Sequence, residues 1–145
     1  MKNRKGGFTL VELMVVAVIV AILAAVAIPL MSANKRRAMT TEAQAGLGTI
    51  RTALRAMYAE TGAYNKKQDN TTIANGSSPT LLSGIGANDL DGRYFNTAAY
   101  TLTTVTTNTY LITATGSSST TPNASDVAGI VVTLDNSGNF TITGM

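Results

Sequence analysis

The chain has 145 residues, no cysteine, no histidine and a formal net charge of +3 at pH 7. That length suits one compact domain plus a membrane segment. The missing residue types exclude disulfides, cysteine nucleophiles and the usual general base, and they remove the commonest zinc ligands. Three of the 11 basic side chains fall within residues 1–7, and the remainder carries 8 basic and 8 acidic residues. The folded part therefore gives no support for nucleic-acid binding, and we expect no enzyme activity, cofactor, catalytic residue or metal site.

An apolar run follows the short basic start of the chain. Residues 8–31 contain a single charged side chain, Glu12, and they follow the small pair Gly6-Gly7. As a helix this run would extend about 36 Å, enough to cross a hydrocarbon core of about 30 Å. In a secretory signal the small residues follow the apolar run, whereas here they precede it. Cleavage at that point would leave the membrane segment on the mature protein.

The stretch from Asn34 to Gly62 predicts an amphipathic helix. Its large apolar residues recur mostly at steps of three and four, which is the period of a helical face; they are Leu47, Ile50, Leu54, Met57 and Tyr58. Gly62 is typical of a helix C-cap. Residues 8–62 could form one helical rod, and we expect an interruption where Pro29 removes a backbone donor.

The rest of the chain is rich in Thr, Ser, Asn and Gly. Residues 65–90 show no clear period and predict a loop region. Runs of β-forming residues bounded by turn residues then predict four strands, at 100–106, 109–115, 129–134 and 140–143. The expected fold class is α+β: a long N-terminal helix, with its first half spanning a membrane, packed on a small antiparallel sheet of about four strands.

The segment Gly7-Phe8-Thr9-Leu10-Val11-Glu12, with basic residues before it and an apolar run after it, resembles the type IV pilin and pseudopilin family. The resemblance covers roughly residues 2–31, and beyond residue 62 it is only architectural. It implies that a membrane peptidase cuts after Gly7 and that the new N-terminal Phe8 is N-methylated. It also places the glutamate and the helix-breaking proline of the family on Glu12 and Pro29.

Glu12 has two interpretations. A carboxylate within a membrane helix costs about 2.5–3.5 kcal/mol on insertion scales, and residues 8–31 contain no Lys or Arg to offset it. The first interpretation is that Glu12 lies near the interface and is hydrated. The second is that cleavage creates a cationic amine on Phe8, which pairs with Glu12 of a neighbouring subunit and fixes the register of assembly. The complete motif favours the second.

Three further segments leave alternatives open. Pro29 produces a simple kink or, as the family resemblance implies, a helix that melts locally in a filament. The cluster Lys35-Arg36-Arg37 is a solvated juxtamembrane group or forms salt bridges between subunits. Asn88-Asp89-Leu90-Asp91-Gly92 misses the spacing of an EF-hand loop, which favours a polar turn over a calcium site.

These observations predict a cleaved leader at 1–7, a transmembrane and assembly helix at 8–34, an amphipathic helix of the head at 35–62, and a head of loops and antiparallel sheet at 63–145. The resemblance implies a structural subunit of a type IV pilus-like filament. The alternatives are a pseudopilin of a type II secretion system and a membrane-anchored binding domain that does not polymerise. The implied partners are copies of the chain itself, the prepilin peptidase and N-methyltransferase, the assembly machinery and the inner membrane. The precursor would cross that membrane once with its head outside, and the filament would be extracellular or periplasmic.

Overall fold

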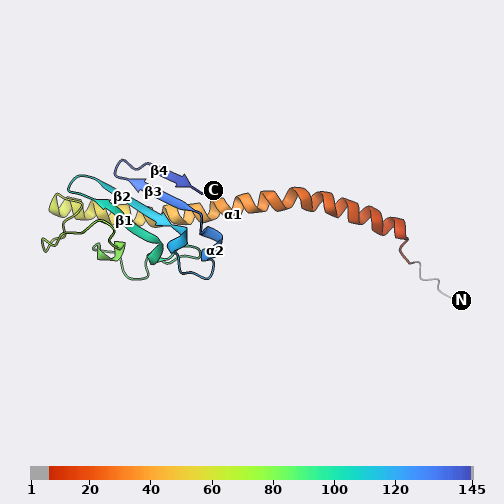
Figure 1. Cartoon of the computed structure of the whole chain (residues 1–145), viewed down its shortest axis with the longest axis horizontal. Helices are drawn as coiled ribbons and strands as arrows, with labels where there is room; N and C mark the ends of the chain where they lie inside the picture. Colours follow the sequence, from red (N-terminus) through yellow and green to blue (C-terminus); the bar gives the residue numbers. More distant parts are fainter. Residues whose placement is uncertain (1–6, 145) are drawn as a thin grey trace. The chain divides into compact units, whose positions relative to one another are not determined.

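The computed structural model describes residues 7–144 of the chain, so the basic residues Lys2, Arg4 and Lys5 lie outside the described part. The chain divides into two compact units, Met1–Arg36 and Arg37–Met145. One helix, α1 (Leu10–Thr61), begins in the first unit and ends in the second. The other principal elements all belong to the second unit (Figure 1).

In the first unit, α1 begins directly after Thr9, and the amide of Leu13 donates to the Thr9 carbonyl at 3.3 Å. The helix continues through Pro29, so the expected interruption there is wrong. Proline removes one amide donor from the helical ladder, but the flanking turns keep helical geometry. The Ser32 hydroxyl donates to the Pro29 carbonyl at 2.9 Å and adds a local hydrogen bond at this point.

In the second unit, α1 provides one side of the hydrophobic core. The residues that it buries recur at steps of three and four, as expected for one face of a helix; they include Met39, Ala43, Leu47, Ile50, Leu54 and Met57. Tyr58, which we expected on this face, is 38% exposed and lies at its margin. Gly62 has φ of 73° and donates its amide to the Tyr58 carbonyl at 2.8 Å. This left-handed conformation ends the helix and confirms the predicted C-cap.

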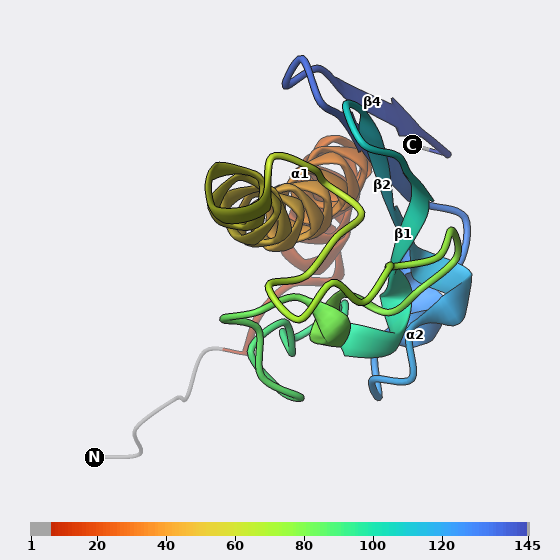
Figure 2. The same ribbon diagram turned by 90° about the vertical axis from the view of Figure 1, so that its left-hand side faces the viewer.

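The other side of the core is a four-stranded antiparallel sheet in the order β1-β2-β3-β4. Its strands are β1 (Tyr100–Val105), β2 (Tyr110–Thr115), β3 (Val131–Asp135) and β4 (Phe140–Thr143). The sheet lies along one side of α1 (Figure 2). Its inner face contributes Leu102, Ile112, Ala114, Val132 and Leu134 to the core. The predicted α+β fold class and the four predicted strands are confirmed, and no strand end differs from its predicted position by more than two residues.

The outer face of the sheet carries a row of threonines. Thr101 pairs with Thr113, Thr113 with Thr133, and Thr133 with Thr141, so the row crosses all four strands. These four side chains are partly or fully exposed. Threonine has high β-propensity and a polar hydroxyl, which accounts for the Thr-rich composition of this region.

The connections contain short helical pieces that we did not predict. They are 3-10 helices at Pro79–Leu81, Thr97–Ala99 and Gly116–Ser118 and one turn of helix, α2 (Ala124–Val127). In the polar segment 117–123, Ser119 is buried, and its hydroxyl donates to the Tyr94 carbonyl at 2.7 Å. Tertiary contacts therefore order a segment whose composition alone indicates a loop.

A carboxylate joins α1 to the loop before β1. Glu42 Oε1 accepts hydrogen bonds from the backbone amides of Tyr94 and Phe95, each at 2.7 Å. This contact holds the fully buried Phe95 ring near Tyr100, with 6.2 Å between ring centroids. Burial raises the pKa of Tyr100 well above its usual value, and the Glu42 carboxylate raises it further. The phenol therefore stays neutral throughout the physiological pH range.

The two glycines inside the second-unit part of α1 should respond oppositely to substitution. A Cβ at Gly46 would overlap the hydroxyl and ring of Tyr100, whereas a Cβ at Gly48 would meet no atom within 4 Å. We expect Gly46→Ala to destabilise this unit by about 1–3 kcal/mol through overpacking. Gly48→Ala should stabilise it by about 0.5–1 kcal/mol, because alanine restricts the unfolded chain and favours helix.

The measurement is thermal unfolding of the full chain in detergent, followed by the near-ultraviolet circular dichroism of its buried tyrosines. Shifts of the same sign for both variants would contradict the assignment of Gly46 as the contact point of Tyr100.

Candidate assembly site at the start of α1

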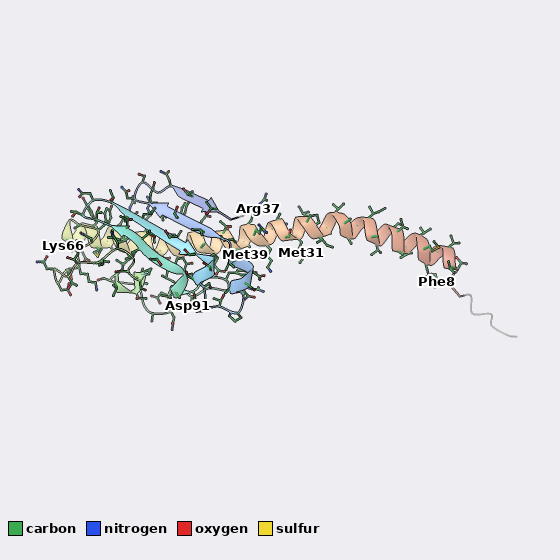
Figure 3. The ribbon with its side chains drawn as sticks, viewed as in Figure 1. Phe8, Met31, Arg37, Met39, Lys66 and Asp91 are labelled. Atoms are coloured by element: carbon green, nitrogen blue, oxygen red, sulfur yellow. The ribbon has the colours of Figure 1, made fainter. Side chains whose placement is uncertain are left out.

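The first unit exposes a continuous apolar surface. All its large hydrophobic side chains from Phe8 to Met31 are at least 52% exposed, and they extend outward around the helix (Figure 3). By length and composition, α1 is the one helix in the described part of the chain that could cross a membrane. Leaving such a surface in water would be very unfavourable, so this segment requires a bilayer or neighbouring apolar helices.

Glu12 lies in the first turn of that helix and forms a reciprocal cap with Thr9. Glu12 Oε2 accepts hydrogen bonds from the Thr9 amide at 2.7 Å and from the Thr9 hydroxyl at 2.8 Å. The Glu12 amide in turn donates to Thr9 Oγ1 at 3.2 Å. This arrangement is a capping box, in which the two side chains satisfy amides that have no partner within the helix. A negative charge at a helix N-terminus also interacts favourably with the helix dipole.

The capping box leaves part of the carboxylate available. In the described part of the chain, Glu12 Oε1 accepts no hydrogen bond, while Oε2 is held toward the end of the helix. The carboxylate is therefore positioned within one turn of Phe8 with one oxygen able to bind a cation. Our sequence analysis missed this cap, although the spacing Thr9-x-x-Glu12 before an apolar run is its usual signature.

Gly7 and Phe8 precede the helix and are both exposed. A Cβ at Gly7 would meet nothing within 4 Å, and the Phe8 side chain is 83% exposed. The fold therefore does not require glycine at position 7. Any requirement for a small residue there must come from another molecule.

Pro29 does not belong to the same cluster. It follows Glu12 by 17 residues, or about 26 Å along a helix. The structure thus brings Thr9 and Glu12 together, with Gly7 and Phe8 adjacent in the chain, and places Pro29 elsewhere on the apolar surface.

The acidic segment that superficially suggested calcium forms turns. The Gly86 amide donates to Asp89 Oδ2 at 2.7 Å, and the Thr97 amide and hydroxyl donate to Asp91 Oδ1 at 2.8 and 3.0 Å. Within residues 7–144 there is no group of three or more His, Cys, Asp or Glu that could hold a metal ion. These contacts favour the polar-turn interpretation.

Comparison with known proteins gives three results. Residues 2–28 match the family model described as the prokaryotic N-terminal methylation motif. A stretch of 62 residues is 40% identical to the type IV major pilin protein PilA of Myxococcus xanthus, covering 43% of this chain and 28% of that protein. The fold also aligns with the crystal structure of the non-core minor pilin PilV of Neisseria meningitidis. The alignment covers 77% of this chain and 90% of the PilV chain, with a TM-score of 0.47 and 21% sequence identity.

The family model matches the N-terminal motif ahead of the long apolar helix. Over part of its length the chain is similar to a type IV pilin. It spans just over a quarter of the length of the Myxococcus relative.

Proposed function

We propose that the chain is a structural subunit of a type IV pilus-like filament. The observation that supports this most directly is the capping box of Glu12, which holds a carboxylate at the start of the exposed apolar part of α1. The subunit would wait in the inner membrane with its head outside. A prepilin peptidase would then cleave after Gly7 and methylate the amine of Phe8, and the subunit would enter the filament.

Ionic pairing would fix the register of assembly. Cleavage after Gly7 leaves a cationic amine on Phe8, four residues before Glu12. In the membrane, both groups lie near one end of the apolar segment, where water and headgroups can reach them. In a filament core, packed helices exclude water. The cationic amine of one subunit and the Glu12 carboxylate of its neighbour would then each require the other as an ion-pair partner. The free oxygen of the capping box supplies the acceptor for that pair.

A pseudopilin of a type II secretion system is the second candidate. The same N-terminal motif and exposed helix would serve a short periplasmic filament equally well. The similarity to a protein named as a major pilin favours the surface pilus. Filaments sheared from the cell surface would support the pilus, whereas loss of protein export on deletion, without surface filaments, would support the pseudopilus.

Mass spectrometry should find the N-terminus of assembled subunits at Phe8, carrying a methyl group. We expect Gly7→Leu to block processing and leave the full leader, because the backbone of a glycine fits a peptidase that a bulky side chain would obstruct. Gly7→Ala should be processed, but poorly. The head should fold normally in both variants, because a Cβ at position 7 would meet no atom within 4 Å. Filaments built from subunits that retain Lys2 would contradict the proposed processing.

A further inference from the structure

We propose that Asn70 is the attachment site of an N-linked glycan. The pattern Asn-x-Ser or Asn-x-Thr, with x other than proline, marks acceptors for this modification. The sequence contains the pattern four times, beginning at Asn70, Asn75, Asn123 and Asn139. So short a pattern also arises by chance in a chain rich in Asn, Ser and Thr, and the structure separates the four.

Two of the four acceptor side chains hold distant parts of the fold together. Asn75 Oδ1 accepts a hydrogen bond from the Val105 amide in β1 at 2.7 Å, and Asn123 Nδ2 donates to the Arg93 carbonyl at 3.1 Å. The partner is 30 positions away in both cases. A transferase must bind the acceptor side chain in its active site, so modification at either position would first break a tertiary contact.

The third acceptor, Asn139, belongs to the connection between β3 and β4. Its Nδ2 donates to Asp135 Oδ2 at 3.2 Å, and its backbone amide donates to Oδ1 of the same carboxylate at 2.9 Å. The hydroxyl residue of this pattern, Thr141, pairs with Thr133 in the sheet. Presenting this site to an enzyme would therefore require β4 to leave the sheet.

Asn70 lies in a different environment, at the tip of a local hairpin. Its side chain and that of Thr72 are exposed, and within residues 7–144 neither the Asn70 side-chain amide nor the Thr72 hydroxyl makes a hydrogen bond. Asn70 has φ of 67°, a left-handed conformation that asparagine adopts more readily than most residues. The acceptor nitrogen and the hydroxyl that the pattern requires are therefore both available.

The hairpin is closed by contacts within itself. The Lys67 amide donates to the Thr71 carbonyl and the Asn70 amide donates to the Lys67 carbonyl, each at 3.0 Å. Its base is anchored by the buried Ile73, whose amide donates to the Asn65 carbonyl at 2.8 Å. Opening the tip breaks short-range bonds and leaves the core intact, and local openings of this kind require little free energy.

The reaction is a glycosyl transfer from a polyprenyl diphosphate-linked glycan. A bond forms between Asn70 Nδ2 and the anomeric carbon of the first sugar, and the bond from that carbon to the diphosphate oxygen breaks. Nδ2 loses one proton, and the polyprenyl diphosphate leaves with the electron pair of the broken bond. Such donors are used on the outer side of the membrane, and the site therefore rests on the outside location of the head proposed above.

A glycan on Asn70 would also identify an end of the head that faces water. Lys66, which pairs with Thr72, lies at the opposite end of the second unit from Met39 (Figure 3). A glycan is bulky and strongly hydrated, so it cannot be buried between packed subunits. This end of the head would accordingly remain at the surface of a filament.

The test is mass spectrometry of the full chain purified from the membrane fraction of its own cells. Tandem spectra with electron-based fragmentation, which keeps sugars attached to peptides, should place a glycan on Asn70 and none on the other three acceptor asparagines. Asn70→Gln and Thr72→Ala should each lose the added mass completely. Thr72→Ser should retain it, because serine supplies the same hydroxyl.

Thr141→Ala is the matched control, since it removes the hydroxyl from another exposed copy of the pattern. It should carry the same added mass as the wild type. Circular dichroism of the buried tyrosines checks that each variant is folded.

Three results would overturn the proposal: an unmodified Asn70 in the wild type, a glycan that persists in Asn70→Gln, or an equal loss in Thr141→Ala. The same spectra report the N-terminus of the chain. A chain that begins at Phe8 with no glycan on Asn70 would overturn the site and leave the proposed processing intact. A glycan on Asn70 of a chain that retains its leader would have the opposite meaning.

Discussion

Replacing Glu12 by leucine should abolish filaments while leaving normal amounts of the subunit in the membrane. Leucine removes the cost of about 2.5–3.5 kcal/mol for a carboxylate in a membrane helix, so the free subunit should insert at least as well as wild type. The assembled state loses the partner of the Phe8 amine. An unpaired ion among packed apolar helices costs several kcal/mol, and a filament would repeat that cost at every subunit.

Glu12→Gln separates charge from shape. Glutamine keeps the length of the side chain and, through its carbonyl oxygen, can still accept from the Thr9 amide and hydroxyl. We expect few or no filaments, as with leucine, because the amine still lacks an anion. Electron microscopy of sheared filaments, compared with immunoblots of the membrane fraction, measures both quantities. Abundant filaments from Glu12→Leu would mean that apolar packing alone sets the register.

Thr9 variants test whether the capping box positions that carboxylate. Thr9→Val keeps the shape of the side chain but removes the hydroxyl that donates to Glu12 Oε2 at 2.8 Å. The hydrogen bond from the backbone amide of residue 9 to Glu12 Oε2, at 2.7 Å, remains. We expect a partial loss of filaments, smaller than that of Glu12→Leu. Thr9→Ser restores the hydroxyl and should assemble nearly as wild type does. Identical yields for valine and serine would show that the amide alone positions the carboxylate.

Phe95→Ala should cause the largest loss of stability of any single substitution considered for the second unit. The Phe95 ring is fully buried and is among the largest side chains in the core. Truncating a buried phenylalanine costs about 3–5 kcal/mol through lost apolar contact and the cavity that remains. The cost should lie toward the upper part of that range. The hydrogen bond from the Phe95 amide to Glu42 fixes the backbone there, so the backbone cannot readily move to fill the cavity.

Phe140→Ala is the matched control, since Phe140 lies on β4 and is 40% exposed. We expect it to cost about 1 kcal/mol or less. Thermal unfolding of both full chains in detergent, followed by tyrosine circular dichroism, gives the comparison. Equal losses for the two variants would contradict the assignment of Phe95 as a central core residue.

Sequence patterns predicted the elements that depend on local periodicity. Helical spacing identified the buried face around Leu47, Ile50 and Leu54, and β-forming runs identified all four strands, because burial of one face imposes these periods on the sequence. The apolar run and its single acid identified the candidate site. Gly62 identified the end of α1, because few other residues adopt its left-handed conformation readily.

Features that depend on contacts distant in the chain could not be predicted. The bond from Glu42 to Phe95 joins residues 53 positions apart, and nothing near Phe95 signals that its ring is the centre of a core. Gly46 is small because Tyr100 packs on it, which local helix propensity does not reveal. At Pro29 we gave the lost amide donor too much weight, although neighbouring turns can maintain a helix across one missing bond.

The order of the strands bears on how the head would fold if it crosses the membrane in the orientation that we propose. Each strand pairs with its neighbours in sequence. The β1–β2 and β3–β4 connections are short, and the β2–β3 connection contains the 3-10 helix Gly116–Ser118 and α2. The sheet can therefore grow in chain order. Closing short loops costs little chain entropy, and folds rich in near-sequence pairings form quickly. In the orientation that we propose, the anchored helix emerges first and presents its apolar face as a template, and the strands then add in the order of their translocation. The time for which the aggregation-prone Thr- and Val-rich segments remain unpaired would then be set by the rate of translocation.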